Sequence, residues 1–185
     1  MKDLNFKNPL TWFAVGFGSG LSPLAPGTLA SFIAGLIFYF LFFPYSESLS
    51  LKFISLIYFI FLLTCFFFGL LIYEKVIGKE DDVNIFVWDE FVGMWIACFP
   101  LFFFQTLWPW ILISFTFFRI LDIWKPSLIG HFDRLKGALG VMMDDVVAGL
   151  ISALILVTSF YFYLKNNFSH ISICSMSDYK DIHPE

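Results

Sequence analysis

Long apolar runs separated by short charged segments dominate this chain. Four stretches contain no charged residue: Leu29–Phe43, Phe53–Tyr73, Phe91–Phe118 and Val146–Leu164. Runs of about 20 apolar residues match the roughly 30 Å hydrocarbon core of a bilayer, whereas helices of soluble proteins are seldom apolar on every side. The pattern therefore predicts an all-α integral membrane protein, built as one helical bundle.

Proline, glycine and charged residues divide these runs into about five expected membrane spans. The spans are Leu29–Phe43, Lys52–Tyr73, Val87–Phe104, Trp108–Ile123 and Asp145–Leu164. The third and fourth are joined by a very tight turn at Gln105–Pro109, so their division is the least well defined. We expect one membrane-embedded domain over residues 1–164, followed by a polar, irregular and disordered tail over residues 165–185.

The segment before the first span is predicted to be irregular. Pro9–Val15 is apolar but too short to cross a membrane, which favours an interfacial or re-entrant helix. Gly16–Thr28, with the sequence GFGSGLSPLAPGT, holds four Gly and two Pro and predicts neither a regular helix nor a strand. Irregular backbone near a membrane is tolerated where protein buries it or water reaches it. Thr28 is the expected N-cap of the first span.

The distribution of basic residues orients the predicted bundle. Eight of the 11 basic residues lie on one side, in the N-terminal lead and in the connections Glu74–Phe86 and Arg119–Asp145. The connections Pro44–Leu51 and Gln105–Pro109 contain no Lys or Arg. Because basic residues in short loops favour the cytoplasm, we expect the charged side to be cytoplasmic. Five spans then put the tail outside.

The composition supports a membrane protein and disfavours several other classes. Of the 185 residues, 59% are hydrophobic and 14% are charged, against about 25% charged in soluble domains. The net charge of −4, with no basic stripe, gives no indication of nucleic-acid binding. Cys65 and Cys98 lie in apolar runs, which favours small buried side chains over a disulfide framework. A cleavable signal peptide is not expected, because Met1–Asn8 is polar with both signs of charge and no short apolar region with a small-residue cleavage site follows it.

Carboxylates gather where the spans meet water on the charged side. Asp89 and Glu90 begin the third span, Asp122 ends the fourth, and Asp144 and Asp145 begin the fifth. One acidic pair alone would be explained by complementing a helix dipole, worth about 0.3–1 kcal/mol for each residue. Two pairs and Asp122 on the same membrane face favour a divalent metal site, since Mg²⁺ prefers carboxylate, water and phosphate oxygens.

Basic residues accompany these acids. Arg119, Asp122 and Lys125 are three residues apart and share one helix face, provided that the helix continues that far. A phosphate group needs neutralising cations, and Arg offers it a bidentate fork. Snorkelling towards lipid phosphate is an equally good explanation for Arg119 and Lys125, and the favoured one for Arg134 and Lys136.

The sequence gives weaker signals for the role of the glycine-rich segment and for the identity of the nucleophile. Backbone N–H groups and the hydroxyls of Ser19, Ser22 and Thr28 are available to an anion, although a structural connection is the commoner role of such a loop. There is no Cys-x5-Arg arrangement, no Asp-x-Asp pair before a Thr, and His131 is the only His in the charged region. Water activated by a metal and a carboxylate is therefore the expected nucleophile.

At these same residues the chain resembles a known family, the bacterial phosphatidylglycerophosphatase A enzymes. The resemblance rests on GFGSGLSPLAPGT, VWDEFVGMWIA and FRILDIWKPSLIGHFDRLKGALGVMMDDVVAGL, and it covers about Trp12 to Ser152. It implies a magnesium-dependent enzyme of the bacterial inner membrane that converts the phospholipid phosphatidylglycerophosphate to phosphatidylglycerol. Two departures affect only local backbone geometry: Ala30 replaces a usual Gly, and Gly137-Ala138-Leu139-Gly140 replaces a Gly-Gly pair.

Carried over by motif, the resemblance implies a role for each matching residue. The family's acidic positions correspond to Asp89, Glu90, Asp122, Asp133, Asp144 and Asp145, its basic positions to Arg119, Lys125 and Arg134, and its loop to Ser19–Thr28. Mg²⁺ is expected on Asp89, Glu90, Asp144 and Asp145. The phosphate is expected on Arg119, Lys125 and Arg134, with Ser19, Gly20, Ser22 and Thr28. Asp122 or Asp145 is expected to orient or deprotonate the attacking water, beside Lys125 as a further catalytic residue.

An ion-coupled transporter with an interfacial carboxylate site is the main alternative. The acids lie on one membrane side rather than at the midplane, and the sequence shows no inverted repeat, which favours the enzyme. A purely structural or assembly role would leave the five interfacial carboxylates unexplained.

Overall fold

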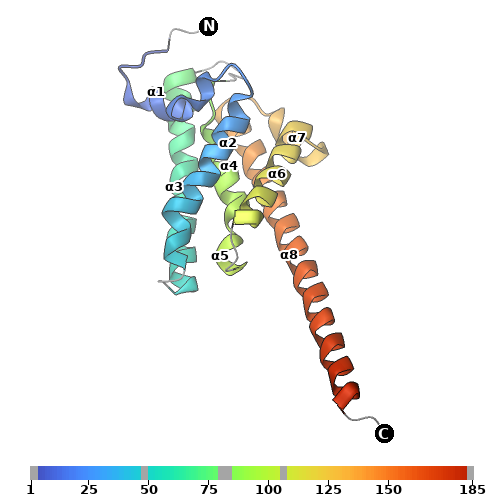
Figure 1. Ribbon diagram of the computed structural model, residues 1–185. Helices are drawn as coiled ribbons and strands as arrows, with labels where there is room; N and C mark the ends of the chain where they lie inside the picture. Colours follow the sequence, from blue (N-terminus) through green and yellow to red (C-terminus); the bar gives the residue numbers. More distant parts are fainter. Residues whose placement is uncertain (1–3, 47–49, 79–84, 105–107, 183–185) are drawn as a thin grey trace.

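Helices are the regular secondary structure of the described part of the chain, which contains no strand, as the apolar pattern predicts (Figure 1). The computed structural model describes residues 4–46, 50–78, 85–104 and 108–182, without the side chains of residues 43, 46, 108, 127, 133 and 167–182. The expected connections 44–51, 74–86 and 105–109 lie partly outside these ranges. In chain order the elements are α1 (Pro9–Ala14), the 3-10 segment η1 (Gly16–Leu21), α2 (Pro26–Ile37), the π-helical η2 (Phe38–Phe42), the 3-10 segment η3 (Phe43–Ser46), α3 (Leu51–Ile72), the π-helical η4 (Tyr73–Ile77), α4 (Trp88–Cys98), α5 (Leu101–Phe104), α6 (Trp108–Trp124), α7 (Ser127–Asp133) and α8 (Ala138–Ile182).

Each expected span has a helical counterpart. The third span is divided into α4 and α5 around Pro100, whose ring cannot continue a helix. α2 begins at Pro26 rather than after the predicted N-cap Thr28, because the fixed φ of Pro suits the first helical position. α8 starts before Asp145 and continues to Ile182. The expected irregular tail is therefore corrected to a helix, and residues 165–182 contain neither Gly nor Pro to end it.

Among the described residues, two helices are long and apolar enough to cross a membrane, Leu51–Ile77 and Ala138–Asn166, and Pro26–Phe42 is a shorter apolar helix. Large apolar side chains on their outer faces are exposed, among them Phe67 and Leu154. Water disfavours such surfaces, whereas lipid accepts them. Membrane association follows from these features, and the full set of five spans stays a prediction.

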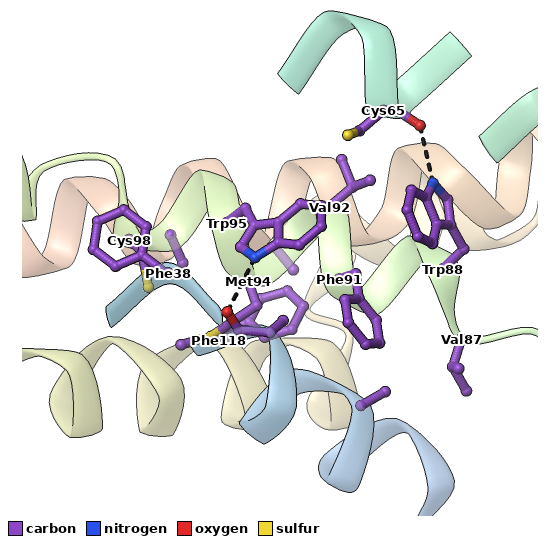
Figure 2. Packing of buried hydrophobic residues seen from close by; sticks show 14 of the residues in the cluster. Phe38, Cys65, Val87, Trp88, Phe91, Val92, Met94, Trp95, Cys98 and Phe118 are labelled. Atoms are coloured by element: carbon purple, nitrogen blue, oxygen red, sulfur yellow. Dashed lines mark hydrogen bonds between the residues drawn. The ribbon is translucent and has the colours of Figure 1, made fainter. Parts of the chain in front are cut away.

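The core is organised around α4, which is buried along most of its length. The indole N–H groups of Trp88 and Trp95 each donate a 3.0 Å hydrogen bond, to the carbonyls of Cys65 on α3 and Ala34 on α2 respectively (Figure 2). The hydroxyl of Tyr58 on α3 donates to the carbonyl of Trp95 at 2.9 Å. These bonds, made inside an aromatic core, fix α4 between its neighbours.

α4 and α8 cross in close contact at two glycines. A Cβ at Gly149 would overlap the carbonyl of Gly93, and a Cβ at Gly93 would lie 2.7 Å from the ring of Phe118 and 2.8 Å from the carbonyl of Asp145. Small residues allow helix backbones to approach in this way. Gly93 lies one turn after Asp89, and Gly149 lies one turn after Asp145. The crossing therefore sets the separation of the two acidic pairs.

Candidate active site

A charged cavity of about 650 Å³ lies where four helices meet at one end of the bundle. The starts of α2, α4 and α8 and the end of α6 converge there, next to α7 (Figure 1). Five carboxylates and four basic side chains line it: Asp89, Glu90, Asp122, Asp144 and Asp145, and Arg119, Lys125, Arg134 and Lys136. The fold thus brings together charged residues that lie far apart in the sequence, with 56 positions separating Asp89 from Asp145.

Three carboxylates form a compact cluster inside this cavity. One oxygen from each of Asp89, Glu90 and Asp145 lies within 4.8 Å of the others. Asp89 and Asp145 are only 8% and 3% exposed. The Oε2 atom of Glu90 and the Oδ1 atom of Asp145 have no hydrogen-bond partner among the described residues. Buried, unpaired carboxylate oxygens are costly, and a set of oxygens facing one another suits a divalent cation.

Local backbone contacts hold both acidic pairs in place. The N–H of Glu90 donates to Oδ1 of Asp89 at 3.0 Å, and the N–H of Asp145 donates to Oδ1 of Asp144 at 3.0 Å. Asp89 and Glu90 also occupy the first turn of α4, where the helix dipole stabilises negative charge. The first acid of each pair is thereby anchored to the backbone of the second.

Asp144 pairs with Lys125 instead of joining the three-carboxylate cluster. The Nζ of Lys125 lies 2.9 Å from Oδ2 of Asp144, so the expected four-carboxylate metal set is divided. Lys125 follows the end of α6 and has a φ of 44°. This left-handed conformation is uncommon outside Gly, and backbone strain of this kind concentrates at functional sites. The face shared by Arg119 and Asp122 thus ends before Lys125.

Arg119 connects α6 to the cavity. Its Nη1 donates to Oδ2 of Asp122 at 2.6 Å and to Oγ of Ser31 at 3.3 Å. The side chains of Arg119 and Asp122 are each 13% exposed. The Nε of Arg119 is buried without an acceptor among the described residues. Because a guanidinium group has five N–H donors, Arg119 retains donors for an anionic ligand.

The first turn of α2 forms another wall, with Ala25, Pro26 and Gly27 lining the cavity. A Cβ at Gly27 would overlap the carboxylate of Glu90 and would lie 3.3 Å from Nη1 of Arg119. The backbone therefore approaches these charges as closely as a glycine permits. A helix start also presents unbonded N–H groups to an anion.

The loop residues expected at the phosphate site lie elsewhere. None of the four lines the charged cavity: Ser19, Gly20, Ser22 and Thr28. The Ser19 hydroxyl donates to the Gly16 carbonyl at 2.8 Å, and the Ser22 hydroxyl donates to the Leu24 carbonyl at 3.0 Å. These two hydroxyls stabilise the loop itself, and the residues of this segment that line the charged cavity are Ala25, Pro26 and Gly27.

The remaining predicted residues lie at or near the rim. Arg134 is exposed, lines the cavity and donates from Nε to the carbonyl of Gly130 at 3.1 Å. The side chain of Asp133 lies outside the described residues. Sequence reasoning favoured lipid contact for Lys136 and overlooked Gly27, yet both line the cavity. The signal for Gly27 is its place directly after Pro26 at the start of an apolar run.

This fold and cavity define an all-helical, membrane-associated protein whose charged site suits a phosphorylated ligand. The chain belongs to the phosphatidylglycerophosphatase A family, whose family model matches residues 12–160, and it is a phosphatase. The match includes every residue of the charged cavity and confirms the resemblance seen in the motifs. It favours the enzyme over the transporter.

Curated relatives agree with this assignment. A phosphatidylglycerophosphatase A from Escherichia coli is 42% identical over 159 residues, covering 83% of this chain and 84% of the relative. One from Haemophilus influenzae is 38% identical over 173 residues, covering 89% and 96%. A putative phosphatidylinositol-3-phosphatase from Bacteroides thetaiotaomicron is 37% identical over 149 residues, covering 78% and 89%. No solved structure gives a significant match.

Proposed function

We propose that this phosphatase hydrolyses the terminal phosphomonoester of phosphatidylglycerophosphate, giving phosphatidylglycerol in phospholipid biosynthesis with the help of Mg²⁺. The observation that carries the proposal is the Asp89, Glu90 and Asp145 cluster, which shares one cavity with Arg119 and Lys125. Two relatives are named for this activity, and the third for another phosphorylated lipid. A phosphomonoester on a lipid headgroup is the chemistry common to the three names.

The three-carboxylate cluster fits a magnesium ion. Asp89, Glu90 and Asp145 would hold it, because they offer only oxygen ligands and two of their oxygens are buried without a partner among the described residues. When bound, Mg²⁺ supplies Lewis-acid stabilisation of negative charge on the phosphoryl group. Asp144 stays with Lys125 and holds its ammonium group at the cavity.

The basic residues bind and orient the phosphate. Arg119 and Lys125 neutralise its oxygens, and the N–H groups at the start of α2 add further donors beside Gly27. Donors that are already fixed in place stabilise the charge that develops in the transition state. The pairs Arg119–Asp122 and Lys125–Asp144 provide that fixation.

Asp122 is the carboxylate that we assign as the general base. Of the two candidates for this role, Asp122 and Asp145, the second belongs to the three-carboxylate cluster, and Asp122 lines the same cavity outside that cluster. Water attacks phosphorus while Asp122 accepts its proton, the bond between phosphorus and the headgroup oxygen breaks, and the departing oxygen takes up a proton. The products are inorganic phosphate and the headgroup alcohol.

The same features support a membrane arrangement for the proposed reaction. We place the charged end of the bundle at the cytoplasmic surface of the bacterial inner membrane, because basic residues gather there, and the apolar helices in a multi-pass arrangement below it. The acyl chains of the substrate then stay in the bilayer, and only the headgroup enters the cavity.

Product analysis tests the proposed reaction. The purified protein in detergent is expected to release phosphate and phosphatidylglycerol in equal amounts from phosphatidylglycerophosphate. Vesicles containing the protein are expected to show no ion flux above protein-free vesicles. Ion flux without phosphate release would contradict the proposal and support the transporter.

Gly27→Ala is expected to lower kcat/KM by about 10–100-fold, because a displacement of about 1 Å in a catalytic site is this costly. The added Cβ would push against the Glu90 carboxylate. Ile33→Val on the same helix is the control, since Ile33 does not line the charged cavity. Equal kinetics for the two variants would contradict a role for the α2 start in the site.

A further inference from the structure

Two apolar hollows lead away from the charged cavity along the contact between α2 and α6. The first, of about 330 Å³, shares the wall residue Ala25 with the charged cavity. The second, of about 280 Å³, shares Phe32 and Phe115 with the first. The three spaces therefore follow one another, each separated from the next by a shared wall.

The walls follow one face of each helix. From the N-cap of α2 into η2 they recur every three or four residues, through Ala25, Leu29, Phe32, Leu36 and Tyr39. The distance from Ala25 to Tyr39 is about 21 Å at about 1.5 Å per residue, which exceeds half of a hydrocarbon core about 30 Å thick. The hollows thus run from the headgroup site through the depth of one leaflet.

Polarity falls along the same path. Ser22 and Thr28 belong to the first hollow, whereas the second is lined by large apolar side chains together with Tyr39 and Gly35. A Cβ at Gly35 would lie 3.2 Å from Cε of Met94, so the glycine keeps the second hollow open. A phospholipid has the same gradient, from a charged phosphate through polar glycerol to a hydrocarbon chain.

We propose that this α2–α6 furrow, made of the two hollows, holds one acyl chain of the substrate while the phosphorylated headgroup occupies the charged cavity. The inference rests on the proposed function. Phe32 and Phe115 meet edge to face, with ring centroids 6.1 Å apart, at the junction that the chain passes. An acyl chain gains little hydrophobic free energy by leaving neighbouring lipids. The furrow therefore acts by positioning the substrate.

Another apolar hollow supplies a matched control. It has a volume of about 420 Å³, lies between α3, α4 and α8, and shares no wall residue with the charged cavity. Leu63 lines it and is 43% exposed, close to the 41% of Leu36 and the 45% of Leu112 in the furrow.

The test compares Leu36→Trp and Leu112→Trp with Leu63→Trp on long-chain and dihexanoyl phosphatidylglycerophosphate in detergent. The furrow variants are expected to lose about tenfold or more in kcat/KM for the long-chain lipid, since a blocked chain displaces the phosphate. Their activity on the dihexanoyl lipid is expected to match that of the wild type. Leu63→Trp is expected to change neither. Equal losses on both lipids, or no loss on either, would overturn the furrow assignment.

Photocrosslinking of the wild-type protein separates this inference from the proposed function and avoids any folding defect of the variants. The probe is phosphatidylglycerophosphate with a diazirine midway along one acyl chain. Crosslinks concentrated on the α2 and α6 residues of the furrow are expected, even if no phosphate is released. Crosslinks spread evenly over the apolar outer faces would overturn the furrow assignment, whereas an inactive wild type would overturn the proposed reaction alone.

Discussion

Asp145→Asn is expected to lower kcat by about a thousandfold, the scale of losing a preorganised charge-stabilising group. The substitution keeps the shape of the side chain but removes one negative charge from the cluster with Asp89 and Glu90. Phosphate release from the lipid by purified protein measures the effect. Glu74→Gln is the control, because Glu74 is an exposed acid that does not line the charged cavity.

Two further readouts identify what Asp145→Asn removes. In EDTA the variant is expected to unfold at a higher temperature than the wild type, because one of three clustered, mutually repelling carboxylates is gone. Binding of Mn²⁺, followed by electron paramagnetic resonance, is expected to weaken in Asp145→Asn and to persist in Asp122→Asn, although both lose activity. Wild-type turnover by folded Asp145→Asn would contradict the assignment of the cluster.

Arg119→Lys is expected to lower kcat/KM by about a hundredfold, since an ammonium group cannot replace a bidentate guanidinium fork. One nitrogen of Arg119 already bonds to Asp122 and Ser31, and its Nε is left for a ligand. The same assay measures Arg134→Lys as the matched control. Arg134 lies exposed at the rim, so we expect its substitution to cost less than about threefold. Equal losses in both variants would contradict the central role of Arg119.

Sequence patterns are sufficient to predict the helices and the gathering of charged residues at one end of the bundle. Uninterrupted apolar runs leave little choice but helix, and acids at the ends of Val87–Phe104 and Asp145–Leu164 are confined to the ends of the bundle. The division between Asp144 and Asp145 was beyond sequence reasoning, because neighbouring helical residues point about 100° apart. Only the packing of α8 against α4 decides which one faces Asp89.

Close backbone contacts were the other feature that the pattern could not supply. The sequence places Gly27 in the predicted irregular segment Gly16–Thr28. Its contact with Glu90 depends on the angle at which α2 enters the bundle. Gly93 and Gly149 each follow an acid by one turn, which is visible in the sequence, but their contact with each other is not. The hydroxyls of Ser19 and Ser22 donate to backbone carbonyls within the same loop. The sequence does not reveal how the loop turns, so it predicted that both hydroxyls were available to a ligand.

Phosphate hydrolysis is expected to depend on a cation held by the clustered carboxylates of Asp89, Glu90 and Asp145. Phosphate release from phosphatidylglycerophosphate by one purified sample tests this dependence, measured first with Mg²⁺, then after EDTA treatment, and again after Mg²⁺ is restored. EDTA is expected to abolish release, and restored Mg²⁺ is expected to recover it. Release that continues unchanged in EDTA would contradict a metal requirement.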